Sequence, residues 1–186
     1  MRAIDILMDE HRTIEPVLDA LERAADHLAR GGTVKPTFFF DAVTFITGFA
    51  DGCHHQKEEG VLFPAMLEGG TFVDGGPIAM MLEEHQEGRR YAGAIRDAAT
   101  RLTDADPTAR DHLISATRGY IALLRDHIQK EDDLVFPMAD ELLSPARQDG
   151  LVRDFGRLDA LLPAERTTDR LRALAESLVR EAAELV

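Results

Sequence analysis

Two segments of the chain repeat one pattern of residues that bind metal ions. Both fit His-x-x-Lys-Glu-[Glu/Asp]-x-x-[Leu/Val]-Phe-Pro, and they begin at His54 and His127. Residues four apart lie on one face of a helix, so each histidine points the same way as the glutamate that follows it. Imidazole and carboxylate groups together suit borderline transition metals. The repeat therefore predicts a metal site.

Two further histidines stand upstream of the repeated segments, at matching places. The four residues that end at His11 resemble the four that end at His85. The interval from His11 to His85 is 74 positions, and that from His54 to His127 is 73. The chain is therefore interpreted as a duplicated pair of helices. Each odd-numbered helix carries one histidine, and each even-numbered helix carries a His-x-x-x-Glu pair.

Four inward histidines and two glutamates form the predicted ligand set, because the cores of helix bundles build such sites from facing helices. If both glutamates bridge two ions, each ion receives two histidine nitrogens and two glutamate oxygens. An octahedral iron then keeps one or two positions for water, an oxo bridge or a small ligand. That incompleteness indicates chemistry or gas binding rather than a closed structural site. The predicted ligands are His11, His54, Glu58, His85, His127 and Glu131.

A rival pair at the same spacing is formed by His55 and Glu59. The position of the Phe-Pro pair favours His54, because His54 and His127 both lie nine residues before the phenylalanine. In an α-helix His55 points about 100° away from its neighbour. We therefore expect His55 and Glu59 at the surface, or in contact with a ligand rather than with a metal. Tyr120 is expected in the core, with hydrogen bonding near the metals as the alternative.

Helical periodicity dominates the sequence, and strand signals are weak throughout. Proline cannot continue a helical hydrogen-bond ladder, so Pro64 and Pro137 are expected to halt a helix or start a short turn. The predicted helices are one that ends at Gly31, then 36–60, 77–102, 107–133, 145–162 and 168–185. They predict an all-α protein, an up-down-up-down four-helix bundle with one or two additional C-terminal helices. Residues 1–140 are expected to form the bundle, with 141–186 packed on it as an extension of the same domain.

Composition and net charge indicate which binding partners and which cellular compartment to expect for this protein. The formal net charge of −13 argues against nucleic acid or an anionic membrane surface as a partner. The single cysteine, Cys53, leaves no intramolecular disulfide and no thiolate metal site. The N-terminus lacks the apolar run of a signal peptide, and no segment is apolar enough to span a membrane. We therefore expect a cytoplasmic protein.

The duplicated segment resembles that of the hemerythrin-like, or HHE cation-binding, domain, and the match runs from about residue 4 to 140. The resemblance implies a non-haem di-iron centre with two iron ions, held in a four-helix bundle by the six ligands named above. Oxygen-carrying hemerythrins usually have a second histidine four residues after the first one of helix 3, where this chain has Arg89. In this respect it looks more like the branch that includes iron–sulfur-centre repair proteins. We expect a coordination vacancy beside Arg89, unless Arg89 points outward as a solvated residue.

Three functions fit these observations. The first is a di-iron protein that binds or reacts with a small oxidant (dioxygen, nitric oxide or peroxide) in stress response or iron homeostasis. The second is an iron-handling or sensing module that acts through a protein partner, which the acidic surface and the C-terminal helices favour. The third is a structural metal bundle that holds zinc, and the open coordination positions count against it. Enzymatic activity and a homodimer both stay open at this point.

Overall fold

The protein is helical in the residues that the computed structural model describes, which are 2–70, 76–103 and 106–185. No strand occurs in these ranges, so the predicted all-α class is confirmed. The helices are α1 (Ala3–Ala29), α2 (Pro36–Phe45), the π-helical η1 (Ile46–His55) and η2 (Glu58–Leu62), α3 (Phe63–Glu68), α4 (Pro77–Thr103), α5 (Ala109–Lys130), the π-helical η3 (Glu131–Val135), α6 (Phe136–Leu142), α7 (Pro145–Ala160), the 3-10 helix η4 (Ala164–Arg166) and α8 (Thr168–Ala183).

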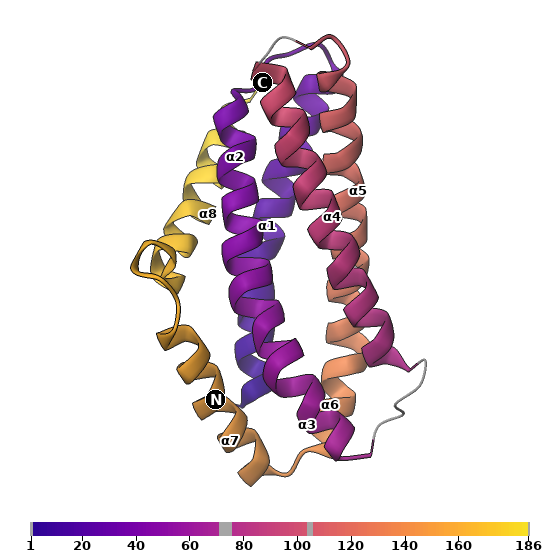
Figure 1. The fold of residues 1–186 in the computed structure, drawn as a ribbon, viewed down its shortest axis with the longest axis vertical. Helices are drawn as coiled ribbons and strands as arrows, with labels where there is room; N and C mark the ends of the chain where they lie inside the picture. The colour runs from indigo at the N-terminus through magenta and orange to yellow at the C-terminus, as the bar shows by residue number, and fades with distance from the viewer. Residues whose placement is uncertain (1, 71–75, 104–105, 186) are drawn as a thin grey trace.

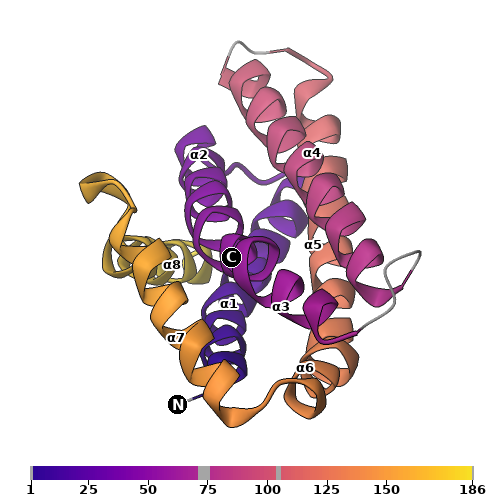
Figure 2. The ribbon, with the colours of Figure 1, turned by 60° about the horizontal axis from the view of Figure 1, so that its bottom comes forward.

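Four long helical segments lie side by side and frame the interior (Figure 1). They are α1, α2 with its continuation η1, α4, and α5; α4 contacts both α2 and α5, and α1 contacts α5. The C-terminal helices lie along the outside of this group (Figures 1 and 2), where α8 contacts α1, α2 and η1, and α7 contacts α1 and η2. The division of the chain into 1–140 and 141–186 stays a prediction.

The prolines of the repeat do not end the helices that carry the ligands. Pro64 lies in the first turn of α3 and Pro137 in the first turn of α6, and each of these helices directly follows a π-helical segment. In an α-helix the proline ring clashes with the carbonyl four residues earlier. The wider π-turn moves that carbonyl away, so the chain stays helical. The predicted helix ends near residues 60 and 133 are therefore wrong.

The buried side chains form two apolar clusters with a polar layer between them. One cluster contains Leu21, Phe49 and Ile95, and the other contains Leu7 and Phe136. On each of the four ligand-bearing segments, the predicted ligands lie between residues of the two clusters. Apolar walls on both sides limit the access of water to the ligands.

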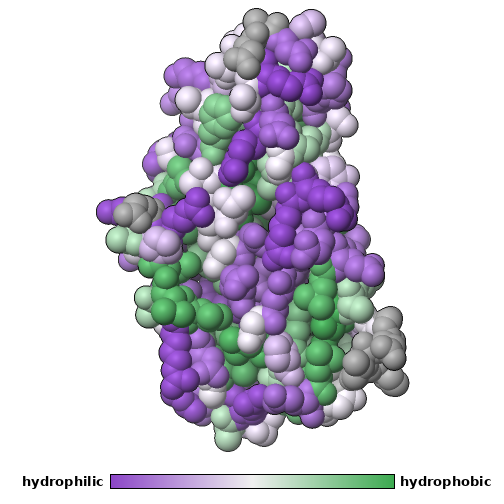
Figure 3. All heavy atoms as spheres, in the orientation of Figure 1, coloured by the Kyte–Doolittle hydropathy of each residue, from purple (hydrophilic) through white to green (hydrophobic). Residues whose placement is uncertain are grey.

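The outer surface mixes polar and apolar residues. Hydrophobic residues gather toward the lower half of the face seen in Figure 3. Met80 and Leu82, near the start of α4, are among the exposed large apolar residues. No helix in the described part of the chain is both long enough and apolar enough to cross a membrane.

Candidate metal centre

The structure brings the six predicted ligands together in the polar layer, and all six are buried. Their ligand atoms belong to two overlapping groups, within each of which the atoms lie no more than 4.8 Å apart. We call these groups site A and site B. Site A is His11, His54, Glu58 and Glu131, and site B is His55, Glu58, His85 and His127.

The two glutamates each direct one oxygen toward each site. Glu58 Oε1 lies 3.5 Å from Nε2 of His54, and its Oε2 lies 3.5 Å from Nε2 of His85. Glu131 Oε2 lies 3.1 Å from Nε2 of the other site A histidine, and its Oε1 lies 3.2 Å from Nε2 of His127. Two carboxylates from duplicated positions are thus placed where each can contact two ions.

Each histidine of the centre meets a carboxylate at its Nδ1 atom. The carboxylate accepts a hydrogen bond from the Nδ1–H group, so the proton of the neutral ring stays on Nδ1. The lone pair of Nε2 is then free for a metal. This arrangement assigns the same tautomer to all five rings. The pairs are His11–Asp132 at 2.8 Å, His54–Glu10 at 3.1 Å, His55–Asp51 at 3.4 Å, His85–Glu59 at 2.7 Å and His127–Glu84 at 2.9 Å.

The Nε2 atoms face one another in pairs. They lie 3.0 Å apart between His11 and His54, and 3.1 Å apart between His85 and His127. Two nitrogen lone pairs repel each other at that separation. Two nitrogens bound to one ion at about 2.1 Å lie about 3 Å apart when they meet the ion at a right angle. The pairs therefore fit two metal positions.

Several buried polar atoms of the centre lack a hydrogen bond. Among the described residues these include both carboxylate oxygens of Glu58, both of Glu131, and Nε2 of His55. The 3.1 Å contact of Glu131 with His11 is not a hydrogen bond in this tautomer, because Nε2 then has no proton to donate. Buried polar atoms normally have partners. A metal ion is a partner that both carboxylate oxygens and imidazole lone pairs can bind. The residues present therefore fit a metal ion.

The pKa directions within the centre differ between its carboxylates. Burial, and next the negative charge of Glu131, raises the pKa of Glu58 well above its ordinary value. Burial acts on Glu131 too, but when the neighbouring histidines are protonated in the absence of metal, the positive charge of His127 and the contacts with His11 and His54 lower the pKa of Glu131. Burial lowers the pKa of His55 to about 4, so this ring is neutral at pH 7. A cation would replace the proton that Glu58 tends to hold.

His55 does not lie at the surface, which was one of the two places expected for it. It is 5% exposed, and its ring stacks on His85 with the centroids 3.8 Å apart. The expectation assumed an α-helix, but η1 is π-helical and rotates less per residue, so His54 and His55 both face the interior. The corresponding residue of the second half is Ile128, so the repeat contained no signal for His55.

The lysines of the repeat hold the carboxylates that orient the even-helix histidines. Lys57 Nζ lies 2.6 Å from Oε1 of Glu10, whose other oxygen meets Nδ1 of His54. Lys130 pairs with Glu84 in the same way in the second half. These roles were not predicted from the sequence, although the lysine of the repeat and the glutamate before each odd-helix histidine recur in both halves.

The acidic residues that follow Glu58 and Glu131 each reach a histidine of the opposite half. Glu59 meets Nδ1 of His85, and Asp132 meets Nδ1 of His11. Glu59 thus takes the outer-contact role that was one of the two expectations for it. Each half of the duplication therefore orients a histidine of the other half, which explains why both copies keep an acid at this place.

A cavity of about 170 Å³ lies beside site B, between the α2–η1 segment and α4. Its lining includes His55, His85, Arg89, Arg96 and Tyr120. The other lining residues are mostly small or apolar, from α2, η1 and α4. Tyr120 is buried, as expected of a core residue. The cavity is large enough for small neutral molecules to come close to the histidines of site B.

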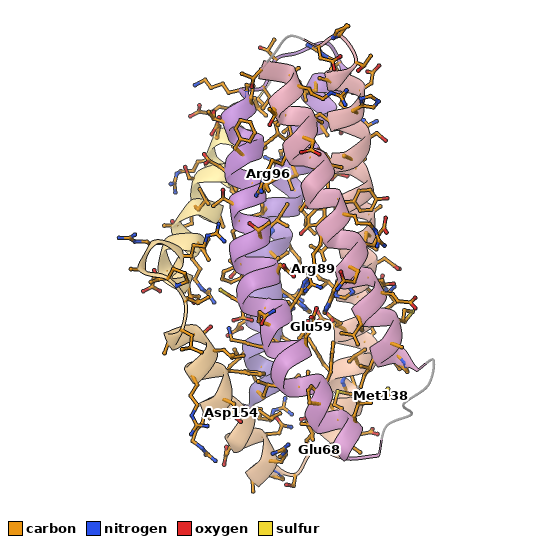
Figure 4. The ribbon with its side chains drawn as sticks, viewed as in Figure 1. Glu59, Glu68, Arg89, Arg96, Met138 and Asp154 are labelled. Carbon is orange, nitrogen blue, oxygen red and sulfur yellow. The ribbon has the colours of Figure 1, made fainter. Side chains whose placement is uncertain are left out.

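Arg89 lines this cavity, and its side chain is partly buried in ion pairs rather than directed into solvent. Its guanidinium group lies 2.7 Å from Asp51 and 2.7 Å from Glu59. Figure 4 shows Arg89 and Glu59 close together, with Arg96 farther up α4. Asp51 and Glu59 are the carboxylates that meet the Nδ1 atoms of two site B histidines. Arg89 forms an ion pair with both of these carboxylates and so connects them. The alternative of a solvated Arg89 is wrong.

Comparisons with known proteins agree with this geometry. The family model for the hemerythrin HHE cation-binding domain matches residues 2–139. An uncharacterized protein of Mycobacterium tuberculosis is 26% identical over 138 residues, which are 74% of this chain and 53% of the relative. The iron-sulfur cluster repair protein YtfE of Dickeya chrysanthemi is 28% identical over 133 residues, 70% of this chain and 60% of the relative. That of Edwardsiella ictaluri is 30% identical over 132 residues, 69% and 59% of the two chains.

The chain thus spans little more than half the length of these curated relatives. No solved structure matches it significantly. The family match covers the range that contains every residue of sites A and B. Its cation-binding description agrees with the donor atoms gathered there, which suit iron. From the family match and the two groups of ligands, we conclude that this chain belongs to the hemerythrin HHE cation-binding domain family.

Proposed function

We propose that this protein is a non-haem di-iron protein that binds or reacts with a small oxidant, such as dioxygen, nitric oxide or peroxide, in stress response or iron homeostasis. The observation that carries the proposal is the pair of adjacent sites that share Glu58, together with the position of Glu131. Each of these two glutamates directs one oxygen toward a histidine of each site. Imidazoles combined with carboxylates form a set of donors that suits iron. Iron bound there would supply oxidant binding and electron transfer.

The candidate ligands divide between two metal ions. His11 and His54 would hold one ion, and His55, His85 and His127 the other, with both glutamates bridging. His55 thus replaces the histidine that oxygen carriers place at the position of Arg89. The cavity beside site B gives small molecules a route, and the two apolar clusters exclude water. We also infer that the four long segments form the up-down-up-down bundle expected for this family.

The alternative is an iron-handling or sensing module that acts through a protein partner. It is favoured by the relatives described as iron-sulfur cluster repair proteins, which share this domain. The acidic surface, with a formal net charge of −13, suits an exchange of cations with a partner. Both proposals require the same metal centre, and they differ in whether iron stays in place during the activity.

Metal content tests the centre. Protein reconstituted with Fe²⁺ without oxygen should hold about two iron ions per chain, and His54→Ala and His127→Ala should each lower that number sharply. His112→Ala is the matched control, because His112 is exposed and hydrogen-bonds Arg101 outside the centre. Iron measured by atomic emission decides the result. Unchanged iron in both ligand variants would contradict the assignment, and zinc without reactivity would indicate a structural site.

Reactivity separates the two proposed functions. Reduced, iron-loaded protein is mixed with dioxygen, nitric oxide or peroxide in a stopped-flow spectrometer, and iron is measured again afterwards. A spectral change with full retention of iron supports oxidant chemistry. Loss of iron to an added metal-free iron–sulfur protein, without reaction with any oxidant, supports the iron-handling alternative instead.

A further inference from the structure

A chain of buried charges connects the C-terminal helices to site A. The side chain of Lys57 is fully buried, and its Nζ lies 2.6 Å from Glu10 and 2.8 Å from Asp159. Glu10 is also buried and meets Nδ1 of the site A ligand His54 at 3.1 Å. Asp159 belongs to α7, beyond the range 2–139 that matches the family. A carboxylate outside the family domain is therefore connected by three contacts to His54, a candidate ligand of site A.

The second half of the duplication shows which group Asp159 replaces. There Lys130 pairs with Glu84 and, at 2.8 Å, with Asp126 of its own helix. The residue at the place of Asp126 in the first half is Cys53, whose thiol donates to a backbone carbonyl at 3.2 Å. A thiol that donates this hydrogen bond keeps its proton and carries no charge, so it cannot balance a lysine. Helix α7 supplies the missing negative charge.

Lys57 depends on both of its acidic partners, because a buried ammonium group without partners is costly. Lys130 is different, since 24% of its side chain reaches solvent. The side chain of Asp159 is 38% exposed, so it is the member of this chain of contacts that solvent or another molecule can reach.

We propose that Asp159 is a positioning residue that couples the docking of α7 to metal binding at site A, through Lys57, Glu10 and His54. With α7 docked, Asp159 and Glu10 share Lys57, and Glu10 keeps the orientation in which it holds the His54 ring. Release of α7 leaves Lys57 with one partner and admits water, so Glu10 holds His54 less firmly. By linkage, a metal at site A strengthens the docking of α7 by the same factor.

This coupling gives the C-terminal helices a role that the metal centre alone does not require. Helix α7 becomes an element whose position depends on the state of site A, and whose displacement weakens that site. The inference rests on the proposed metal centre, but it concerns residues that the family domain does not contain. It can therefore fail while the metal centre stands.

Two matched substitutions test the coupling in the full-length protein. Asp159→Asn removes the charge that α7 contributes, and Asp126→Asn removes the corresponding charge of the second half. Affinity for Fe²⁺ is measured against a competing chelator without oxygen. Asp159→Asn should weaken the binding of one of the two ions by about threefold to tenfold, less than the effect typical of a direct partner of a ligand. Asp126→Asn should change it by less than about twofold, since Asp126 is 69% exposed.

Hydrogen exchange supplies a readout that does not depend on reactivity. Fe²⁺ should slow amide exchange in residues 145–160 of the parent protein and of the Asp126→Asn variant, but not in Asp159→Asn. Cys53 is the single cysteine and lies near Lys57 and Asp159, so its labelling by a thiol reagent reports on the same region. Metal should slow this labelling in the parent protein and have little effect in Asp159→Asn.

Several outcomes overturn the proposal. One is an Asp159→Asn variant with the affinity and the metal-dependent protection of the parent protein, and another is an equal loss in Asp126→Asn. If Asp159→Asn does not fold, the parent protein still decides: no change in exchange at 145–160 on metal binding refutes the coupling. A parent protein that binds no iron contradicts the proposed function instead, so the two failures are distinguishable.

Discussion

The second nitrogen of each histidine is as important to the candidate centre as the nitrogen that faces the metal. The carboxylates that meet the Nδ1 atoms stand on other helices for four of the five histidines, and only Asp51 lies on the same helical segment as its partner His55. Such a partner selects the tautomer, orients the ring and raises its basicity as a ligand. The outer carboxylates therefore decide how well the five rings bind metal.

At the residue scale, His55→Phe separates ligation from packing. The substitution keeps an aromatic ring that can stack on His85 but removes the nitrogen that joins site B. We expect affinity for one of the two Fe²⁺ ions to fall by more than about tenfold, because a ligand matters at least as much as its outer partner. Chelator competition measures the affinity. His112→Phe is the control, and parent-like affinity in His55→Phe would show that His55 only packs.

The second prediction at this scale concerns Arg89. Arg89→Ala removes the cation that Asp51 and Glu59 share, so both carboxylates should hold their histidines less firmly. We expect Fe²⁺ affinity at site B to fall by about tenfold. Arg96→Ala is the matched control, since Arg96 lines the same cavity, is exposed, and makes no ion pair within the described residues. Equal effects of the two substitutions would mean that general charge, not the bridge, is responsible.

At the scale of elements, the π-helical segments are a feature that α-helical periodicity in the sequence does not predict. Segments η2 and η3 begin at Glu58 and Glu131 and end just before the Phe-Pro pairs. They let the backbone pass each proline without a break, so that the ligands and the apolar cluster below them lie on continuous helices. Such wide turns are often found at functional sites.

The contact between η1 and α8 gives a prediction at the same scale. A Cβ atom added at Gly48 would lie 2.9 Å from a methyl carbon of Leu171, which is buried in the core. Gly48→Ala should therefore push α8 outward and lower the free energy of unfolding by about 1 kcal/mol, because overpacking exceeds the gain in helix propensity. Denaturant titration measures this change.

The control for this substitution lies on α7. An added Cβ at Gly156 meets nothing within 4 Å, and the residue is exposed. Gly156→Ala should stabilise the protein by up to about 1 kcal/mol through helix propensity alone. Two changes of the same sign would contradict the packing that we assign to α8.

At the scale of the whole molecule, the metal centre places charge where an apolar protein would be more stable. Glu58 and Glu131 are both buried and lie close together, between two apolar clusters. The pKa of Glu58 is raised, so the folded protein without metal keeps a proton that the unfolded chain loses above about pH 4.5. This carboxyl therefore lowers the stability of the metal-free protein as the pH rises above that value. Function and stability oppose each other here.

Glu58→Gln should consequently have opposite effects with and without metal. Without metal at pH 7 we expect a gain of about 1 kcal/mol, or roughly 2–4 °C in Tm. With Fe²⁺ at a thousand times its Kd, binding adds about 4 kcal/mol to the parent protein, roughly 8–16 °C. The variant should lose most of this increment. Calorimetry of both forms checks the result, and a fall in Tm without metal would refute the idea that Glu58 destabilises the empty fold.

The sequence alone determined much of this protein. The all-α class, the family and the six ligands within sites A and B follow from local information: helical periodicity, and a pattern that occurs twice. The duplication makes the pattern recognisable in the sequence, because both copies contribute residues to the same centre. The ligand assignment itself stays a prediction until metal content is measured.

Only the tertiary structure decided the rest. His55 lies in site B because η1 is π-helical. The spacing of an α-helix would instead direct its side chain away from that of His54. The carboxylates on Nδ1 come mostly from other helices, and Asp159 reaches Lys57 from a helix about a hundred residues later in the chain. Such contacts depend on which helices pack together and in which register. Periodicity within one helix fixes its buried face, but not the neighbour that this face meets.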